Sequence, residues 1–204
     1  MIRLLFCILA LASLPLGPGL RAETLPSAWR VEGVSAGDVL NIRAGPTASS
    51  GILGTIPRDS SRVEVLMLSE DGKWGLVGFP EGNGWVAMRY LAPVPPPPAG
   101  EMPRPMRCLG TEPFWSLSRE AQGGTWSVPE EPGQKIAFLQ AYAAPGGYYA
   151  QAEDRDGRML HLIVTREVCT DGMSDRIYGF SARLFAQHRD GNRLYSGCCT
   201  LDGR

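Results

Sequence analysis

The sequence has no excess of charge of either sign. Its 20 Lys and Arg residues are balanced by 21 Asp and Glu residues, so the formal net charge is −1. It also has no run of Lys and Arg that could follow a phosphate backbone, and binding to nucleic acid depends on neutralising phosphates. We therefore expect no nucleic-acid partner.

Catalytic and metal-binding groups are equally scarce. The chain has only two histidines, His161 and His188. It shows no Ser-His-Asp order, no glycine-rich phosphate loop and no histidine pair at metal spacing. Asp171, Ser174 and Asp175 could hold a hard cation, but the calcium-binding loop with its closing Glu is missing. We therefore predict that the protein is not an enzyme and uses no metal or other cofactor.

Long hydrophobic runs are absent except near the first residue. Residues 4–16 are almost all apolar and follow the basic Arg3. Helix-breaking residues then follow at Pro15, Gly17, Pro18 and Gly19. A membrane-spanning helix needs about 20 apolar residues without such breakers. The layout is instead typical of a secretory signal peptide with cleavage after Ala22. We predict that residues 1–22 are a signal peptide and that the mature protein is periplasmic or secreted, without a membrane span.

The predicted mature chain keeps four cysteines, which are Cys108, Cys169, Cys198 and Cys199. An even number of cysteines in an exported protein favours disulfide bonds. Zinc is the weaker interpretation, because there is no Cys-x-x-Cys spacing and adjacent cysteines chelate poorly. A bond between the adjacent cysteines would strain their shared peptide unit. Two pairings remain open, in which Cys108 and Cys169 each bond to one of the adjacent pair.

Proline divides the chain. Residues 93–105 hold seven of the 17 prolines, including the run from Pro95 to Pro98. Proline fixes φ and lacks an amide donor, so this segment cannot form a helix or an inner strand. We interpret residues 94–105 as a stiff linker between two domains, residues 29–93 and residues 106–204. The alternative is a proline-rich ligand for an aromatic groove of another protein.

Both domains have the pattern of β-structure. Gly, Pro, Asp and Ser clusters separate the β-rich stretches of the N-terminal domain. In the C-terminal domain, residues 160–164 and 180–184 give the clearest alternating runs. We therefore predict an all-β protein: a small N-terminal barrel, then a small antiparallel barrel or sandwich with disulfides. The N-terminal stretches are residues 30–34, 39–43, 52–56, 62–68, 73–79 and 85–90.

One ordered set of motifs in the N-terminal domain carries a resemblance. The set consists of Val39-Leu40-Asn41-Ile42-Arg43-Ala44-Gly45-Pro46, Gly54-Thr55-Ile56-Pro57, Val63-Glu64-Val65, Trp74 and Gly84-Trp85-Val86. It resembles the bacterial SH3 domain, whose pattern starts with Leu-Asn-Val-Arg-x-Gly-Pro and finishes with Gly-Trp-Val. The resemblance implies a small, partly open barrel that binds peptides, commonly those of the cell wall.

The peptide groove of such a domain needs an aromatic wall and one or two polar anchors. The candidates for contact with a ligand are Asn41, Arg43, Trp74 and Tyr90. Alternatively, Trp74 and Trp85 are packing residues, since the Trp85 ring is large enough to fill a small barrel. Arg43 would then only pair with a nearby acid such as Glu64.

The C-terminal domain carries motifs of its own. They are Cys108-Leu109-Gly110-Thr111-Glu112-Pro113-Phe114-Trp115, Cys169-Thr170-Asp171-Gly172-Met173-Ser174-Asp175-Arg176 and Gly197-Cys198-Cys199. These motifs resemble an uncharacterised domain of bacterial envelope proteins and lipoproteins. That family has no established activity to transfer.

A second candidate surface follows from these motifs, because the disulfides could bring the first two together. Its candidate residues are Glu112, Phe114, Trp115, Asp171, Asp175 and Arg176. Alternatively, Phe114 and Trp115 begin the core, and the acidic residues cap turns such as Asp171-Gly172.

Export, the resemblance and the missing catalytic groups together favour an exported cell-envelope binding protein. Its SH3-like domain would recognise cell-wall peptide, so the expected partner is peptidoglycan or an envelope protein. The alternative function is an inhibitor or regulator of an envelope enzyme such as lysozyme, which rests on architectural analogy.

Overall fold

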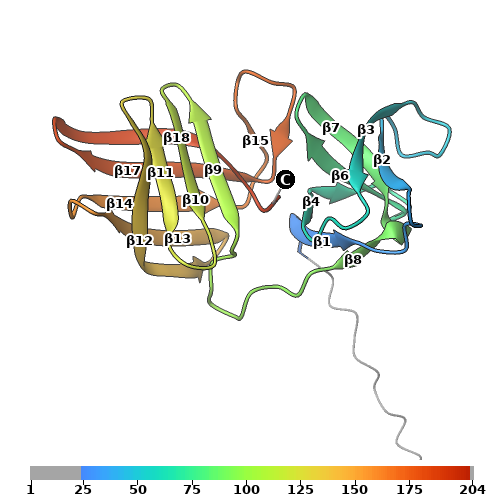
Figure 1. Cartoon of the computed structure of the whole chain (residues 1–204), viewed down its shortest axis with the longest axis horizontal. Helices are drawn as coiled ribbons and strands as arrows, with labels where there is room; N and C mark the ends of the chain where they lie inside the picture. Colours follow the sequence, from blue (N-terminus) through green and yellow to red (C-terminus); the bar gives the residue numbers. More distant parts are fainter. Residues whose placement is uncertain (1–23, 203–204) are drawn as a thin grey trace, which may run out of the picture.

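The computed structural model describes residues 24–202, and the predicted signal peptide lies outside these residues. Within them the protein is all-β, and the one helical element is the short 3₁₀ helix η1 (Met88–Tyr90). Figure 1 shows two β-structured units side by side, joined by an irregular segment that passes below them. The predicted all-β fold class is confirmed.

The N-terminal unit consists of two sheets around one core. The first sheet has the order β4 (Val63–Val65), β1 (Ser27–Val31), β8 (Leu91–Pro93). The second has the order β3 (Ile52–Pro57), β2 (Val39–Arg43), β7 (Gly82–Ala87), β6 (Trp74–Phe79), β5 (Met67–Leu68). The core is aliphatic and contains Val31, Leu40, Ile42, Ile56, Val63, Val65, Val77, Val86 and Leu91.

Alternation along the strands decides which side chains enter this core. In β2, Leu40 and Ile42 are buried while their neighbours are partly exposed, as the sequence predicts. In β7, Val86 is buried and the preceding Trp85 is only half-buried, outside the core. The expectation that Trp85 fills the barrel is therefore wrong, because Trp85 points to the opposite face of its strand from Val86.

The C-terminal unit is a closed antiparallel barrel of eight strands in the order β10-β11-β12-β13-β14-β17-β18-β9. Consecutive barrel strands are neighbours, and β9 closes the ring by pairing with both β10 and β18. Of the two predicted architectures, the barrel is therefore the one formed. Its strands are β9 (Met106–Thr111), β10 (Phe114–Arg119), β11 (Gly124–Val128), β12 (Glu131–Ala144), β13 (Gly147–Asp154), β14 (Met159–Thr165), β17 (Phe180–His188) and β18 (Gly191–Thr200).

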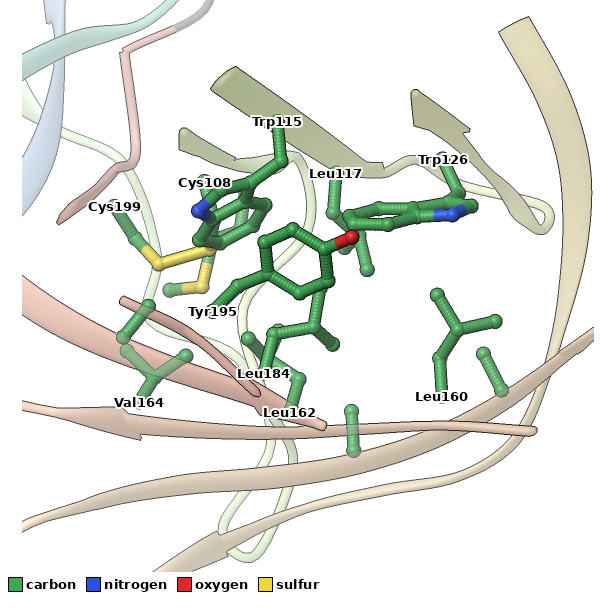
Figure 2. Packing of buried hydrophobic residues seen from close by; sticks show 14 of the residues in the cluster. Cys108, Trp115, Leu117, Trp126, Leu160, Leu162, Val164, Leu184, Tyr195 and Cys199 are labelled. Atoms are coloured by element: carbon green, nitrogen blue, oxygen red, sulfur yellow. A yellow bond between two sulfur atoms is a disulfide. The ribbon is translucent and has the colours of Figure 1, made fainter. Parts of the chain in front are cut away.

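Large aromatic side chains fill the barrel interior (Figure 2). The rings of Trp126 and Tyr195 meet nearly edge to face, with centroids 5.4 Å apart, and Trp115 lies 5.9 Å from Trp126. Small side chains on other strands leave room for these rings, and both Ala150 and Ala182 are buried in the same cluster. The interior is thus a packed core.

Two disulfides are formed, Cys108–Cys199 and Cys169–Cys198. This is one of the two pairings that the sequence left open. The first joins the neighbouring strands β9 and β18 inside the barrel. The second ties β15 (Cys169–Thr170) to β18, and β15 forms a hairpin with β16 (Ile177–Tyr178). Disulfides of this kind are consistent with a protein outside the cytoplasm.

The two units are in direct contact. Glu64 of β4 accepts hydrogen bonds from Thr200 Oγ1 (2.7 Å) and from Leu201 N (3.0 Å). Arg62 Nε donates to Leu201 O (3.1 Å). Asn83 of β7 exchanges two hydrogen bonds with the backbone of Ile177 in β16, at 3.1 and 2.7 Å. The N-terminal unit therefore docks on the β15–β16 hairpin and on the segment after β18.

The proline-rich segment is partly built into both units. Val94 N donates to Ala28 O (2.9 Å), and Ala143 N donates to Gly100 O (2.8 Å). Met102 is 1% exposed and belongs to the barrel core.

Among residues 24–202, no helix is long and apolar enough to span a bilayer.

Candidate functional site

All four ligand candidates of the N-terminal unit line one groove of about 180 Å³. Asn41 and Arg43 come from the partly exposed face of β2, Trp74 begins β6, and Tyr90 ends η1. Three elements that are far apart in the sequence therefore bring these side chains together. The sequence pattern alone does not show that they are neighbours in space.

Arg43 is positioned by the turn that follows its own strand. Its Nη1 donates to Ser50 O over 2.7 Å, which holds the guanidinium beside the groove. The alternative in which Arg43 pairs with Glu64 is wrong, since the Glu64 carboxylate is buried against Thr200 and Leu201. The other nitrogens of Arg43 form no ion pair within residues 24–202.

Trp74 is fixed by the turn between β5 and β6. Its backbone N donates to Ser69 Oγ (3.0 Å), and Ser69 Oγ donates to Asp71 (2.7 Å). Hydrogen bonds from Ser69 and from the Lys73 amide lower the pKa of the Asp71 carboxyl, which therefore stays ionised and keeps the turn closed. The half-buried Trp74 ring can thus form a wall of the groove.

Two charged groups of the groove, Asp38 and Arg89, were not predicted from the sequence. The Arg89 guanidinium lies 4.8 Å from the centroid of the Tyr90 ring. Asp38 Oδ1 accepts a hydrogen bond from Val39 N (2.8 Å). Only their positions in the sequence could have indicated them, since Arg89 directly precedes the predicted ligand residue Tyr90 and Asp38 directly precedes β2. The groove therefore combines two aromatic walls, one amide and three charged groups, which suits a short polar peptide.

Comparison with known proteins places this groove in a family. Residues 38–92 are a bacterial SH3 domain. The match runs from the residue before β2 to β8 and contains all four predicted ligand residues. Domains of this type typically bind cell-wall components. Searches of the curated proteins and of the solved structures find no match to the chain.

The second candidate surface has a different position from the groove. The Asp171 carboxylate accepts hydrogen bonds from Ser174 and from the Met173 amide. Burial opposes ionisation of Asp171, but these hydrogen bonds outweigh it and the pKa is lowered. Thr111 Oγ1 donates to Asp171 O (2.7 Å), so the first two motifs of the C-terminal unit do meet. Asp171 thus caps a turn, as the alternative interpretation held.

Arg176 and Asp175 lie where this turn faces the bacterial SH3 domain. The Arg176 guanidinium packs so closely against Gly78 that a Cβ there would be 2.7 Å from Nε. The guanidinium also lies over the ring of Tyr178, 4.7 Å from its centroid. A Cβ at Gly82 would lie 3.9 Å from Asp175. These residues belong to the contact between the two units.

The remaining candidates lie at the start of the barrel. Glu112 is exposed in the turn between β9 and β10, and Phe114 is 55% exposed. Trp115 is 4% exposed, and its Nε1 donates to Ser196 O over 2.8 Å. A ligand on the outer surface would not reach Trp115, which is a core residue.

A wider cleft of about 390 Å³ lies between the units. Leu53, Phe79 and Pro80 of the bacterial SH3 domain face Arg176 and Asp202 across it. No cluster of three or more His, Cys, Asp or Glu side chains within residues 24–202 could hold a metal ion.

Proposed function

We propose that the protein is an exported cell-envelope binding protein whose bacterial SH3 domain holds cell-wall peptide in the groove of Asn41, Arg43, Trp74 and Tyr90. The observation that carries this proposal is the convergence of these four side chains on one groove of a domain type that binds cell-wall components. Export rests on the predicted signal peptide and is supported by the two disulfides.

Binding without catalysis is part of the proposal. Both histidines belong to the barrel, where His161 shares a hydrogen bond with Tyr149 and His188 with Tyr195. The four cysteines of the described chain are bonded to one another, so none supplies a thiolate. The groove itself offers recognition groups rather than a nucleophile beside a base.

The expected affinity for peptide is weak. The groove volume of about 180 Å³ lies below that of sites for drug-sized ligands. A dissociation constant between micromolar and millimolar is therefore expected. Repeated peptides on the same wall polymer would raise the apparent affinity.

Sedimentation with purified peptidoglycan tests this function. We expect Trp74→Ala and Arg43→Ala to reduce the bound fraction of the mature protein severalfold, because each removes a wall or an anchor of the groove. Tyr142→Ala and Arg58→Ala are matched controls, since both residues are exposed and lie outside the groove. If the unmodified protein fails to sediment at high concentration, the wall-binding function is wrong.

The barrel surface favours regulation of an envelope enzyme as a second candidate function. Across strands β12, β13 and β14, Tyr142 lies opposite Tyr149, and Tyr149 lies opposite Ile163. On the next two strands, β17 and β18, Phe185 lies opposite Leu194. Tyr142, Ile163, Phe185 and Leu194 are 45%, 53%, 37% and 68% exposed. Contiguous exposed apolar groups of this kind often mark protein contacts.

A lysozyme assay tests the second candidate. The mature protein should slow the clearing of cell-wall suspensions by lysozyme, and Ile163→Asp should remove this effect by placing a charge in the apolar group. Ile52→Asp is the control, since Ile52 is equally exposed but lies on the N-terminal unit. Unchanged clearing with the unmodified protein would exclude lysozyme as the target.

A further inference from the structure

We infer that the groove of the bacterial SH3 domain selects the carboxylate-bearing end of a peptide, with Arg43 and Arg89 as the groups that recognise the carboxylate. This inference rests on the proposed function and adds the chemical class of the ligand. It distinguishes peptides with a free carboxylate from neutral ones, such as peptides with an amidated end.

The charges of the groove carry the first step. Its charged lining residues are Asp38, Arg43 and Arg89, which leaves one positive charge in excess. Neither arginine forms an ion pair with any part of residues 24–202. Guanidinium groups match carboxylates with two parallel hydrogen bonds, so two arginines without acidic partners favour an anionic ligand group.

The geometry keeps the two arginines available for such a group. Arg43 uses one Nη to hold Ser50 O, which fixes its position and leaves its remaining donors for a ligand. Arg89 is exposed and lies against the Tyr90 ring, which limits the side-chain freedom that binding would have to remove. Trp74 and Tyr90 then face the apolar part of the same ligand.

Asp38 sets a limit on the ligand. Its Oδ1 already accepts a hydrogen bond from the Val39 amide, and the carboxylate forms no ion pair within residues 24–202. A second carboxylate of the ligand close to Asp38 would be repelled, whereas an amino group there would be attracted. The groove therefore suits a peptide whose carboxylate points toward the arginines.

The size of the groove places the carboxylate near a chain end. About 180 Å³ has room for a small fragment rather than for an extended peptide. Capture of a terminal carboxylate is a known mode of peptide recognition. We therefore assign the groove to the last one or two residues of a peptide with a free carboxyl terminus.

Titration of the mature full-length protein with two matched peptides tests this inference. One probe is a short cell-wall stem peptide with a free C-terminal carboxylate, and the other is the same peptide with a C-terminal carboxamide. Binding is followed by chemical shift changes of the Trp74 indole. We expect the carboxamide to bind about tenfold more weakly, which corresponds to one charge-assisted hydrogen-bonded contact.

Three variants separate charge recognition from general damage to the groove. Arg89→Gln and Arg43→Gln should weaken binding of the carboxylate peptide about tenfold. They should weaken binding of the carboxamide much less, so that each variant binds the two peptides with nearly equal affinity. Arg58→Gln should bind both peptides as the unmodified protein does, because Arg58 lies outside the groove.

The outcomes distinguish the inference from the function on which it rests. Equal binding of the two peptides by the unmodified protein would overturn the inference and leave cell-wall binding in place. Equal weakening of both peptides by Arg89→Gln would also overturn it, since the arginine would then act only through packing. Absence of binding by either peptide, together with no sedimentation with peptidoglycan, would overturn both.

Discussion

At the scale of single residues, Glu64 carries the clearest consequence of the contact between the two units. The side chain is 3% exposed, and burial raises the pKa of its carboxyl from 4.5 to about 7. Hydrogen bonds from Thr200 and Leu201 and the charge of Arg176 oppose this shift, while the charge of Asp202 adds to it. The docked protein thus holds the Glu64 proton more tightly than the unfolded chain does.

We expect the stability of the protein to fall as the pH rises from about 5 to 8. The pKa of Glu64 is raised on folding, so its stabilisation is complete below about 4.5 and is lost as the pH passes about 7. The expected loss of unfolding free energy is about 2–3 kcal/mol. Denaturant titrations at several pH values measure it.

Glu64→Gln supplies the control for this pH effect. Glutamine cannot ionise, so the unfolding free energy of the variant should decrease much less between pH 5 and 8. At pH 8 the variant should be at least as stable as the unmodified protein. Burial lowers the pKa of His188, which acts in the opposite direction, so only the difference between variant and unmodified protein isolates Glu64. Identical pH profiles for the two proteins would contradict this account.

Trp115 and Phe114 form a matched pair with opposite environments. Trp115→Phe should lower the unfolding free energy by about 1–2 kcal/mol, because it leaves Ser196 O without its donor and opens space in the core. Phe114→Ala should change it by less than about 0.5 kcal/mol, since the ring is largely exposed. Thermal or chemical unfolding compares the two, and a larger effect at Phe114 would contradict the assignment of Trp115 to the core.

At the scale of elements, the two disulfides hold different parts of the molecule. Cys108–Cys199 spans 91 residues and lies within the barrel wall, whereas Cys169–Cys198 spans 29 residues and fixes the β15–β16 hairpin. That hairpin carries Arg176 and Ile177 to the bacterial SH3 domain. One bond therefore stabilises the barrel, and the other stabilises the docking.

Paired Cys→Ser variants should separate these roles. Loss of the Cys108–Cys199 bond should lower the unfolding free energy by about 4–5 kcal/mol and destabilise the barrel most, because this bond closes the longer loop. Loss of Cys169–Cys198 should cost about 3–4 kcal/mol and increase proteolysis of the hairpin. Unfolding curves and protease mapping measure both. The unreduced, denatured mature protein should meanwhile show no thiol that an alkylating reagent can label.

Strand patterns explain which elements could be predicted from the sequence. Residues 39–43 alternate clearly and form β2 with the expected buried face. The cysteine pairing stayed open because adjacent residues on a strand point to opposite faces, and the sequence does not say which face looks inward. In β18 it is Cys199 that joins the barrel core, so Cys198 is left to bond the hairpin.

The groove was predicted in part for a similar physical reason. Aromatic and polar residue types indicated Asn41, Arg43, Trp74 and Tyr90, which the fold brings together. Arg89 and Asp38 were missed because exposed charges are common and only their place in space makes them neighbours. Arg176 and Asp175 were assigned to a ligand surface because nothing in the sequence shows that two units will dock there.

At the scale of the whole molecule, the two units form one docked body around the proline-rich segment. Met102 is buried in the barrel, and Arg104 donates to Ala121 O and pairs with Glu101. Residues 95–99 are the more exposed part of this segment. A cut there would leave the contacts of Glu64 and Asn83 intact.

We expect a proline-specific endopeptidase to nick the chain near residues 95–99 without separating the halves. The nicked protein should elute as one species in size-exclusion chromatography at pH 6. Asn83→Ala, which removes both hydrogen bonds to Ile177, should let the fragments separate more readily. Fragments of the unmodified protein that elute apart would show that the docking surface is too weak to hold them.

The stretch that ends the barrel also has a consequence for the timing of folding. Cys198 and Cys199 complete both disulfides and the last sheet pairing, and Thr200 and Leu201 complete the bonds to Glu64. The Glu64 partners lie 136 and 137 positions later in the chain. The bacterial SH3 domain can therefore fold before these residues are in place, with the surface that will contact the barrel still exposed to solvent. Closure of the barrel, formation of both disulfides and docking of the two units then all depend on these last residues. A chain that is interrupted before them can complete none of the three.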